Sequence, residues 1–452
     1  MVATNTGAPG LTREDNELLT RVGPDAPMGK LFRQYWIPML FPEELTPEKP
    51  QKRVRLLGED LVAFRTKNGQ FGLVGEFCSH RLASLYYGRV EGEAIRCLYH
   101  GWLYGTTGTC LEQGNLPPEQ QFPHLIKHPG YRCVEHGGVL WAYMGPNAEP
   151  PPLPEFEWAL VPGEQRGLDK VFLECNYLQA MEGGIDPTHV MWLHSPIDLG
   201  DTEASEEQGI QQQLANTTGK RTPEAISLHE TPYGFVYGTK RGMPDGRVLW
   251  RVNQWLMPFY TMPPGGDDRG GRMWVPVDDE HTVRWNVAWY PTREIMERSG
   301  SKNTSIARGP DGRWSRDAQW VGGFQPETAE PYGDIRKAAN RDNDYEMDWE
   351  KHYTRRMGVA GVGLQDICIV ENEGAGKIMD RTKENLCPGD VSTIIARQRL
   401  MEAARALENE GTVPLGARDG SIYRVRGASI PLPADADFLE GIKETTTVPP
   451  TV

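Results

Sequence analysis

The sequence has no long hydrophobic run and no run of basic residues. Its longest apolar stretches, such as residues 138–144, are too short to cross a bilayer, and residues 1–10 lack the charged and apolar regions of a signal peptide. We therefore expect no membrane segment and a cytoplasmic location. A formal net charge of −14 without a stripe of Lys and Arg argues against nucleic-acid binding, because a polyanion would be repelled on average.

Several motifs of common enzyme classes are also missing. No Gly-x-Gly-x-x-Gly follows a predicted strand, and no phosphate-binding loop or acid–base triad is apparent, so a nicotinamide cofactor is not expected to bind this chain directly. Cysteine is sparse. Seven cysteines in 452 residues, an odd number, favour reduced thiols over a disulfide framework. A chain of 452 residues, of which 38% are apolar, is predicted to form a globular protein of two or three domains.

Two of the seven cysteines belong to a paired pattern. Cys78 and His80 lie in one short segment, and Cys97 and His100 lie in a second segment that begins after a gap of sixteen residues. Each segment offers one thiolate and one imidazole, which together form the ligand set of a Rieske 2Fe-2S centre. A structural zinc site could use the same donors, but zinc sites usually pair Cys with nearby Cys and His with nearby His. The mixed pairing favours the iron–sulfur cluster.

Changes in composition and in residue pattern along the chain divide it into five predicted segments. The first contains two helices, and Thr12 is the N-cap of the earlier one. The second has short alternating strands broken by Gly, Asn and Pro, and it contains both ligand segments. A stiff proline-rich connector leads to a larger fourth segment, and a tail rich in Thr and Pro ends the chain. These segments are residues 1–35, 36–145, 146–154, 155–440 and 441–452.

The fourth segment is expected to combine helices with a run of strands. A helical stretch covers residues 179–194, residues 293–348 read as long loops with short helices, and residues 391–408 form a terminal helix. The predicted strands are residues 234–240, 247–259, 272–277 and 282–290.

A second group of candidate metal ligands lies at the start of this segment. His189 and His194 are five residues apart and cannot share a face of a regular helix, so a bulge or a helix end must lie between them. Two histidines and one carboxylate on one side of a ferrous ion leave positions open for oxygen and substrate. The alternative is that both histidines are ordinary core or surface residues. Asp186 precedes His189 by three residues and could accept its second ring N–H.

Both groups resemble motifs of the Rieske non-haem iron aromatic ring-hydroxylating oxygenases. His-Arg ends the first cluster segment and Gly-Trp the second, as in that family, although the family often has proline at the positions of Ser79 and Leu98. Asn176 to His194 matches the catalytic motif Asn-x5-Glu-x3-Asp-x2-His-x4-His. Further segments look like phthalate dioxygenase and its relatives, which include aromatic O-demethylases. They are residues 21–24, 27–29, 55–60, 182–186, 374, 380–382 and 384.

The resemblance implies a fold and further ligands. The fold class would be α+β, with an N-terminal all-β Rieske domain followed by a helix-grip (START/Bet v1-like) catalytic domain of an antiparallel sheet and helices. Asp366, in an Asp-x4-Glu segment, would be the third ligand of the mononuclear iron, with a helix-surface or capping role as the alternative. In the family, the residue matching Asp186 carries electrons from a cluster histidine, here His100, of one subunit to His189 of the next. A homotrimer or two stacked trimers are therefore implied.

The resemblance also implies a reaction. The chain would be the oxygenase component, taking electrons from NAD(P)H through a separate flavin and iron–sulfur reductase or a ferredoxin. With O2 it would hydroxylate an aromatic, carboxylated substrate, and the alternative is O- or N-demethylation with release of formaldehyde. A buried carboxylate needs a cation. Arg251 and Asn253 share one face of a predicted strand and are candidate substrate contacts, unless that face is exposed to solvent. Arg241 and Arg272 are rival cations.

Two other function classes fit parts of the sequence. A zinc-stabilised interaction protein would account for the first four ligands but not for the second histidine pair. A pure electron carrier would account for the first domain but not for His189, His194 and Asp366 in the second. The presence of both groups in one chain favours the oxygenase.

Overall fold

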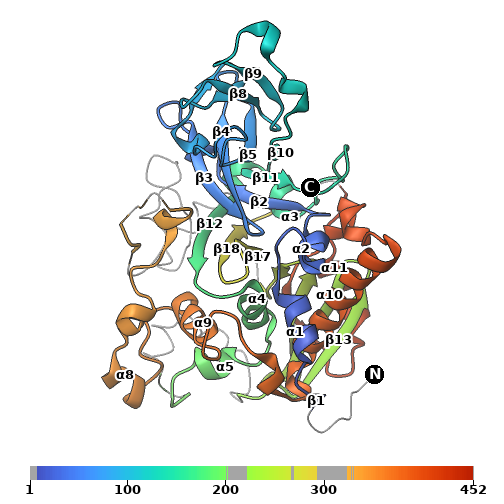
Figure 1. Cartoon of the computed structure of the whole chain (residues 1–452). Helices are drawn as coiled ribbons and strands as arrows, with labels where there is room; N and C mark the ends of the chain where they lie inside the picture. The colour runs from blue at the N-terminus through green and yellow to red at the C-terminus, as the bar shows by residue number, and fades with distance from the viewer. Residues whose placement is uncertain are drawn as a thin grey trace.

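Figure 1 shows a computed structural model of the chain, which describes residues 8–199, 201, 221–265, 269–292, 323–326, 328 and 330–450. Within these ranges, no helix combines the length and the apolar character needed to cross a membrane. Most of the loop region expected at 293–348, namely residues 293–322, lies outside the described residues.

The two helices predicted near the N-terminus are confirmed. Helix α1 (Arg13–Thr20) begins after Thr12, whose hydroxyl accepts a hydrogen bond from the Asp15 N–H at 3.0 Å. Helix α2 (Pro27–Phe32) begins with a proline, whose missing N–H would have had no partner inside the helix. Both helices pack on α10 (Val391–Glu410), far along the sequence. Figure 1 shows them beside it at the right of the molecule.

The first domain contains two antiparallel sheets. A six-stranded sheet has the order β2-β11-β10-β5-β4-β3, and a four-stranded sheet has the order β6-β7-β8-β9 and reaches the upper tip in Figure 1. A small apolar core that includes Val62, Phe64, Ile95 and Tyr104 joins them. The strands are β2 (Trp36–Leu40), β3 (Gln51–Leu56), β4 (Glu59–Arg65), β5 (Phe71–Gly75), β6 (Arg89–Glu91), β7 (Ala94–Arg96), β8 (Trp102–Gly105), β9 (Cys110–Gln113), β10 (Gly130–His136) and β11 (Val139–Tyr143).

The second domain is built on an eight-stranded antiparallel sheet of order β12-β18-β17-β16-β15-β14-β13, with β20 also paired to β15. The strands are β12 (Arg166–Leu173), β13 (Ala225–Thr231), β14 (Gly234–Gly242), β15 (Val248–Leu256), β16 (Tyr260–Met262), β17 (Arg269–Pro276), β18 (Thr282–Trp289) and β20 (Ala428–Leu432). The short strands β1 (Ala8–Pro9) and β19 (Asn385–Leu386) pair with each other. Further helices are α3 (Glu157–Leu160), α4 (Tyr177–Ile185), α5 (Val190–Leu193), α8 (Trp349–Thr354), α9 (Val362–Glu371) and α11 (Phe438–Thr446).

Helix α4 packs unusually close to its neighbours. A Cβ at Gly184 would lie 2.2 Å from Cζ2 of Trp274 on β17, and one at Gly183 would lie 2.7 Å from Cγ1 of Val370 on α9. Contacts that short are not tolerated between real side chains, so both positions need glycine. These glycines allow the end of α4 to lie close to both β17 and α9. The place of the residues that follow α4 is set by this packing.

A buried ion cluster joins the two domains. Glu44 accepts hydrogen bonds from Lys170 of β12 at 2.5 Å and from Lys52 of β3 at 2.7 Å, and Lys52 also contacts Asp334 at 2.5 Å. Burial alone would raise the pKa of Glu44, but the two lysines outweigh burial and lower the pKa to about 2. Because each buried charge is paired, the cluster is expected to resist changes in the relative placement of the domains.

The predicted fold class, an all-β domain followed by a domain of antiparallel sheet and helices, is confirmed. The four predicted strands of the second domain correspond to β14, β15, β17 and β18, whereas β12, β13, β16 and β20 were not predicted. The tail prediction was wrong for residues 441–446, which belong to α11. Phe438 and Ile442, four residues apart, bury one face of that helix in a core cluster with β20.

Candidate functional site

Two loops of the first domain bring the first four predicted ligands together. Cys78 and His80 follow β5, while Cys97 and His100 lie between β7 and β8. Both thiols are buried, and the ring centroids of His80 and His100 are 4.5 Å apart. In each loop a backbone N–H four residues after the cysteine donates to the cysteine carbonyl at 2.8–2.9 Å, which folds the loop back on itself. The spacing seen in the sequence therefore produces one compact donor group.

The chemistry of this donor group fits the expected cluster. Nδ1 of His80 and Nδ1 of His100 are both buried, and neither has a hydrogen-bond partner among the residues that the structure describes. Buried ring nitrogens are normally paired, so two unpaired ones on adjacent rings call for an explanation. Two such nitrogens beside two buried thiols match the donors of a Rieske 2Fe-2S cluster. The residues present therefore fit that group.

One contact to Cys78 was not foreseen from the sequence. The hydroxyl of Tyr104, on β8, lies 3.1 Å from the Cys78 Sγ. The ring of His80 stacks on Trp102, with centroids 4.8 Å apart and an interplanar angle of 4°. A hydroxyl that donates to a cluster sulfur stabilises negative charge there, so Tyr104 belongs to the surroundings that tune such a centre.

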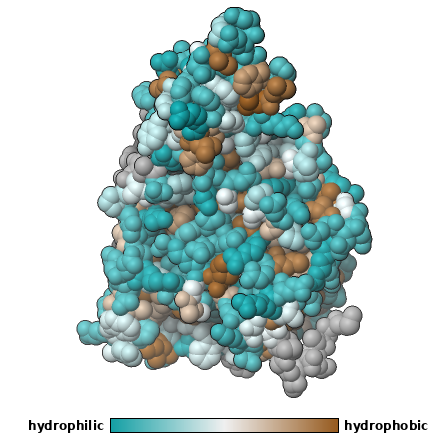
Figure 2. Space-filling view, viewed as in Figure 1, coloured by the Kyte–Doolittle hydropathy of each residue, from teal (hydrophilic) through white to brown (hydrophobic). Residues whose placement is uncertain are grey.

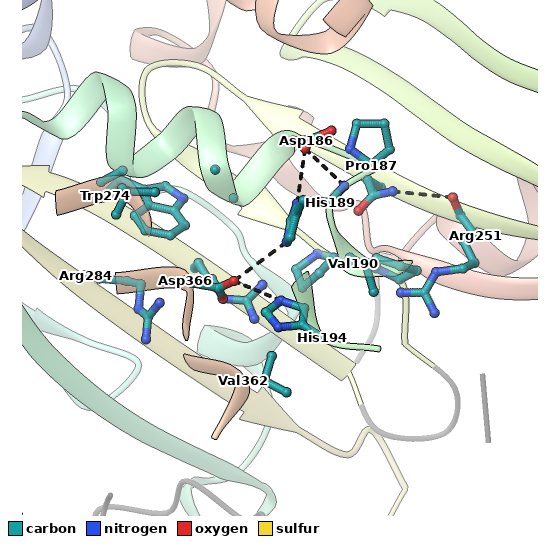
Figure 3. Close-up of a pocket in the computed structure, with 18 of the residues that line it drawn as sticks. Asp186, Pro187, His189, Val190, His194, Arg251, Trp274, Arg284, Val362 and Asp366 are labelled. Carbon is teal, nitrogen blue, oxygen red and sulfur yellow. Dashed lines mark hydrogen bonds and ion pairs between the residues drawn. The ribbon is translucent and has the colours of Figure 1, made fainter. Parts of the chain in front are cut away.

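The second predicted ligand group lies at the break between two helices. Helix α4 ends at Ile185, Asp186 is its C-cap, and α5 begins at Val190. His189 and His194 are the N-cap and the C-cap of α5, so the helix end that lies between the two histidines is the end of α5 at Leu193, whereas the end of α4 precedes both. Asp366 comes from α9, and ligand atoms of the two histidines and Asp366 all lie within 4.8 Å of one another. Figure 3 shows the three side chains pointing toward one another.

The second ring nitrogens of the two histidines face different partners. His194 Nδ1 lies 2.8 Å from the Gln365 Oε1, and the Gln365 Nε2 donates to the Val359 carbonyl at 2.9 Å. The Gln365 oxygen must therefore accept, which puts a proton on His194 Nδ1 and turns Nε2 toward Asp366, 2.9 Å away. His189 Nδ1 lies 3.3 Å from the Asp186 Oδ2 in an ion-pair contact without hydrogen-bond alignment, and Nε2 lies 3.7 Å from Asp366. Gln365 was not foreseen.

The charges of this group favour a cation. Burial alone would raise the pKa of Asp366, but the contacts with His194 and His189 outweigh it and lower that pKa. Burial likewise acts to lower the pKa of His189, yet Asp186 and Asp366 outweigh it and raise the pKa. Two ionised carboxylates thus face two imidazoles whose Nε2 atoms converge. Such a set of two histidines and one carboxylate suits a non-haem ferrous ion with open positions.

The ligand group opens into a cavity of about 310 Å³. Arg251 and Asn253 of β15 line it, as do Arg272 of β17 and Arg284 of β18. Burial and the charge of Arg241 lower the pKa of Arg251 to about 10, and burial and the charge of Arg272 lower that of Arg284 to about 10. The guanidinium groups of Arg251 and Arg272 make no ion pair with any carboxylate of the described residues. The cavity wall therefore carries concentrated positive charge.

Both candidate substrate contacts line this cavity. Arg251 and Asn253 share the cavity with the ligand group, and Figure 3 shows Arg251 on its right-hand side. Of the rival cations, Arg272 lines the cavity. Arg241 is not among the lining residues, and its guanidinium donates to the Arg221 carbonyl. Arg284 was missed, because it lies in a stretch of β18 buried at four consecutive positions and no alternation marks its face.

Two family models match the chain. The model described as "Rieske [2Fe-2S] domain" matches residues 35–124, and the model described as "LigXa C-terminal domain like" matches residues 142–430.

Among curated relatives, the 3-chlorobenzoate-3,4-dioxygenase oxygenase subunit of Comamonas testosteroni is 32% identical, over 91% of this chain and 92% of that protein. The phthalate 4,5-dioxygenase oxygenase subunit of Pseudomonas putida is also 32% identical, over 88% and 87%. The 5,5'-dehydrodivanillate O-demethylase oxygenase subunit of a Sphingobium species is 30% identical, over 94% and 86%.

Solved structures agree on the fold. NdmA of Pseudomonas putida CBB5 with caffeine gives a TM-score of 0.57 at 15% identity, over 91% of this chain and 100% of that chain. The oxygenase of carbazole 1,9a-dioxygenase, in its reduced complex with ferredoxin, gives 0.55 at 17% identity, over 89% and 97%. The predicted resemblance is confirmed by these comparisons and by the length of the matches. The chain belongs to the Rieske oxygenases, oxidoreductases with a 2Fe-2S domain, as an alpha subunit of the group that contains the phthalate and 3-chlorobenzoate dioxygenases and an O-demethylase.

Proposed function

We propose that this chain uses O2 and electrons from a partner protein to hydroxylate an aromatic substrate that carries a carboxylate. One observation carries the proposal: the group His189, His194 and Asp366 shares a cavity with Arg251 and Arg272, which form no ion pair with a carboxylate in the described parts of the chain. A ferrous ion held by that group would supply oxygen activation when bound. The relatives named for phthalate and 3-chlorobenzoate support the same substrate class.

The cavity wall accounts for how such a substrate would be oriented. A carboxylate is best recognised by the planar fork of an arginine, which makes two parallel hydrogen bonds, and Arg251 and Arg272 offer such forks. Trp274, Val362 and Val370 supply apolar surface for a ring. Binding pockets for small molecules usually have about 300–1,000 Å³, so a cavity of about 310 Å³ suits a compact aromatic acid. A carboxylate fixed at the arginines would leave the ring facing the histidines.

We also propose how electrons reach the cavity. The cluster would be held by Cys78, His80, Cys97 and His100, which follow β5 or lie between β7 and β8, whereas α5 and α9 lie near the end of the molecule opposite to β8 in Figure 1. That separation favours delivery from the cluster of a neighbouring copy. Asp186 would be the bridge, from His100 of that copy to His189 of this chain, because its half-buried carboxylate lies against the His189 ring.

Exposed apolar side chains support such an assembly. Leu82 and Leu98, in the cluster loops, are 72% and 55% exposed, and Trp192, in α5, is 65% exposed. Figure 2 shows hydrophobic patches at the upper end of the molecule, which the first domain forms. Clusters of this kind mark interaction surfaces. A homotrimer or two stacked trimers would cover them, and a ferredoxin or a flavin and iron–sulfur reductase would bring electrons from NAD(P)H.

Demethylation is the second candidate. The O-demethylase relative matches 94% of this chain, and oxidation of a methoxy carbon uses the same oxygen chemistry as ring hydroxylation. The cavity supports both reactions, because both substrates can carry a carboxylate.

The decisive experiment is turnover of a matched panel. Anaerobically purified protein, supplied with ferrous ion and a generic reductase with NADH, is given benzoates, phthalates and methoxybenzoates, each beside its neutral amide. Products are scored as hydroxylated or dihydrodiol species labelled from isotopic O2, or as formaldehyde. We expect the acids to be turned over and the amides to be poor substrates. Formaldehyde release would select the second candidate, and equal turnover of acids and amides would refute the substrate class.

A further inference from the structure

The cluster loop departs from the family pattern at Ser79, which lies between Cys78 and His80. Its hydroxyl lies 2.8 Å from Nδ1 of His128, a residue that the sequence analysis did not single out. The other nitrogen of that ring, Nε2, lies 3.0 Å from the Gly75 carbonyl. A carbonyl can only accept, so Nε2 carries the proton and Nδ1 accepts the hydrogen bond from Ser79. His128 is thus a fixed acceptor for this hydroxyl.

His128 is buried and uncharged. Its side chain belongs to a residue only 8% exposed, and burial lowers the pKa of the imidazole to about 4, so the ring is neutral at physiological pH. An acceptor nitrogen in such a position is normally paired, because a buried polar atom without a partner is costly. Ser79 supplies the partner from the exposed loop.

The same ring also supports the residue that contacts the cysteine. His128 packs on Tyr104 with ring centroids 4.2 Å apart and an interplanar angle of 30°. The Tyr104 hydroxyl lies 3.1 Å from the Cys78 Sγ. A chain of contacts therefore runs from Ser79 through His128 and Tyr104 to the sulfur of Cys78.

We propose that Ser79 and His128 are positioning residues that hold the first cluster loop in place and thereby raise the reduction potential of the 2Fe-2S cluster. Proline, frequent at this position in the family, would restrict the loop through its ring. Serine leaves the loop freer, and its hydrogen bond to His128 restores the restriction. A held loop keeps Tyr104 against the Cys78 sulfur, and a hydrogen bond to sulfur favours the reduced cluster, which carries one more negative charge. The inference rests on the cluster ligands proposed above.

The test is a redox titration of the full chain with its cluster, followed by visible absorption and electron paramagnetic resonance. Ser79→Ala removes the hydroxyl and should shift the midpoint potential to a more negative value, in the same direction as Tyr104→Phe but by less. Ser79→Thr keeps the hydroxyl and should stay at the wild-type potential. His128→Phe keeps a stacking ring without its nitrogens and should also shift negative. The midpoint potential of the double variant Ser79→Ala/His128→Phe should shift no further than that of His128→Phe alone, because both changes remove the same hydrogen bond.

A matched control is His124→Phe, since His124 is an exposed histidine four residues away and its replacement should leave the potential unchanged. Wild-type potentials in both Ser79→Ala and His128→Phe would overturn the inference. Loss of the cluster in Ser79→Ala but not in Ser79→Thr would support it, and loss in both would refute a role for the hydroxyl. Absence of a Rieske signal from the wild-type protein would instead refute the cluster assignment itself.

Discussion

Replacement of Arg251 by methionine tests the proposed substrate class most directly. Arg251 is half-buried on β15 and lines the cavity beside the histidines and Asp366. Burial and the charge of Arg241 lower its pKa to about 10, so the guanidinium is still cationic at pH 7 but lacks a compensating carboxylate among the described residues. A substrate carboxylate would supply that compensation. Methionine keeps an unbranched stem of similar reach and removes only the charge and the hydrogen bonds.

The size of the effect follows from the hydrogen bonds lost. A bond to a charged group contributes about 1.5–3 kcal/mol, and the planar fork of Arg251 can form two. Partial exposure screens the interaction, so we take about 3 kcal/mol for the pair. Since about 1.4 kcal/mol corresponds to a tenfold change in rate, kcat/KM for the aromatic acid should fall about 150-fold.

The assay compares the acid with its neutral amide in wild type and variant. The fall should be confined to the acid, so the preference for the acid over the amide should disappear in Arg251→Met. Arg247→Met is the matched control, because Arg247 directly precedes β15, is exposed and is already paired with Asp245. Arg272→Met examines the second cation of the same wall. An unchanged preference in both Arg251→Met and Arg272→Met would show that the cavity does not select carboxylates.

Three other predictions follow from the remaining contacts. Asp366→Ala should abolish oxygenation and deplete mononuclear iron, measured by metal analysis, while the visible absorption of the cluster persists; bleaching would mean that the two sites are misassigned. Asp186→Asn should retain both metals yet slow reoxidation of the cluster in rapid-mixing experiments by at least about tenfold, because the amide lacks the charge of the carboxylate; wild-type kinetics would remove the proposed bridge. The pKa of Glu44, about 2 against the ordinary 4.5, is depressed in the folded protein, so the buried ion cluster stabilises above about pH 4.5 and this stability is lost as the pH falls toward 2. Glu44→Gln should therefore lower the free energy of unfolding, measured in urea, by roughly 3 kcal/mol at pH 7 and by little near pH 2, whereas an equal loss at both pH values would contradict this account.

The donor groups could be predicted because their chemistry is local. Cys78 and His80 lie in one loop and Cys97 and His100 in another, so the spacing alone indicates the mixed ligand set. The five-residue step from His189 to His194 likewise requires a bulge or a helix end between them, and the short helix α5 does end at Leu193, directly before His194. Family resemblance, and not spacing, indicated Asp366, which α9 places beside both histidines.

Other parts of the two sites could not be predicted, because they depend on contacts between distant segments. The register of β12, β18 and β17 sets Asp169 opposite Asn286 and Asn286 opposite Arg272, and no single strand contains that information. Gln365 reaches His194 across 171 residues of sequence, and Ser79 reaches His128 across 49. Gln365 contacts a predicted ligand and Ser79 lies next to two of them, but only packing brings their partners to them.

The sequence by itself determined which residues are candidates for binding metal and that His189 and His194 cannot share a face of one regular helix, because ligand type and short spacing are properties of neighbouring residues. Only the tertiary structure decided that Arg251, Arg272 and Arg284 line one cavity with the histidines, and that Glu44 meets Lys170 between the domains. Strand order and register fix which faces meet, and these are set by the burial of the whole sheet rather than by any one segment.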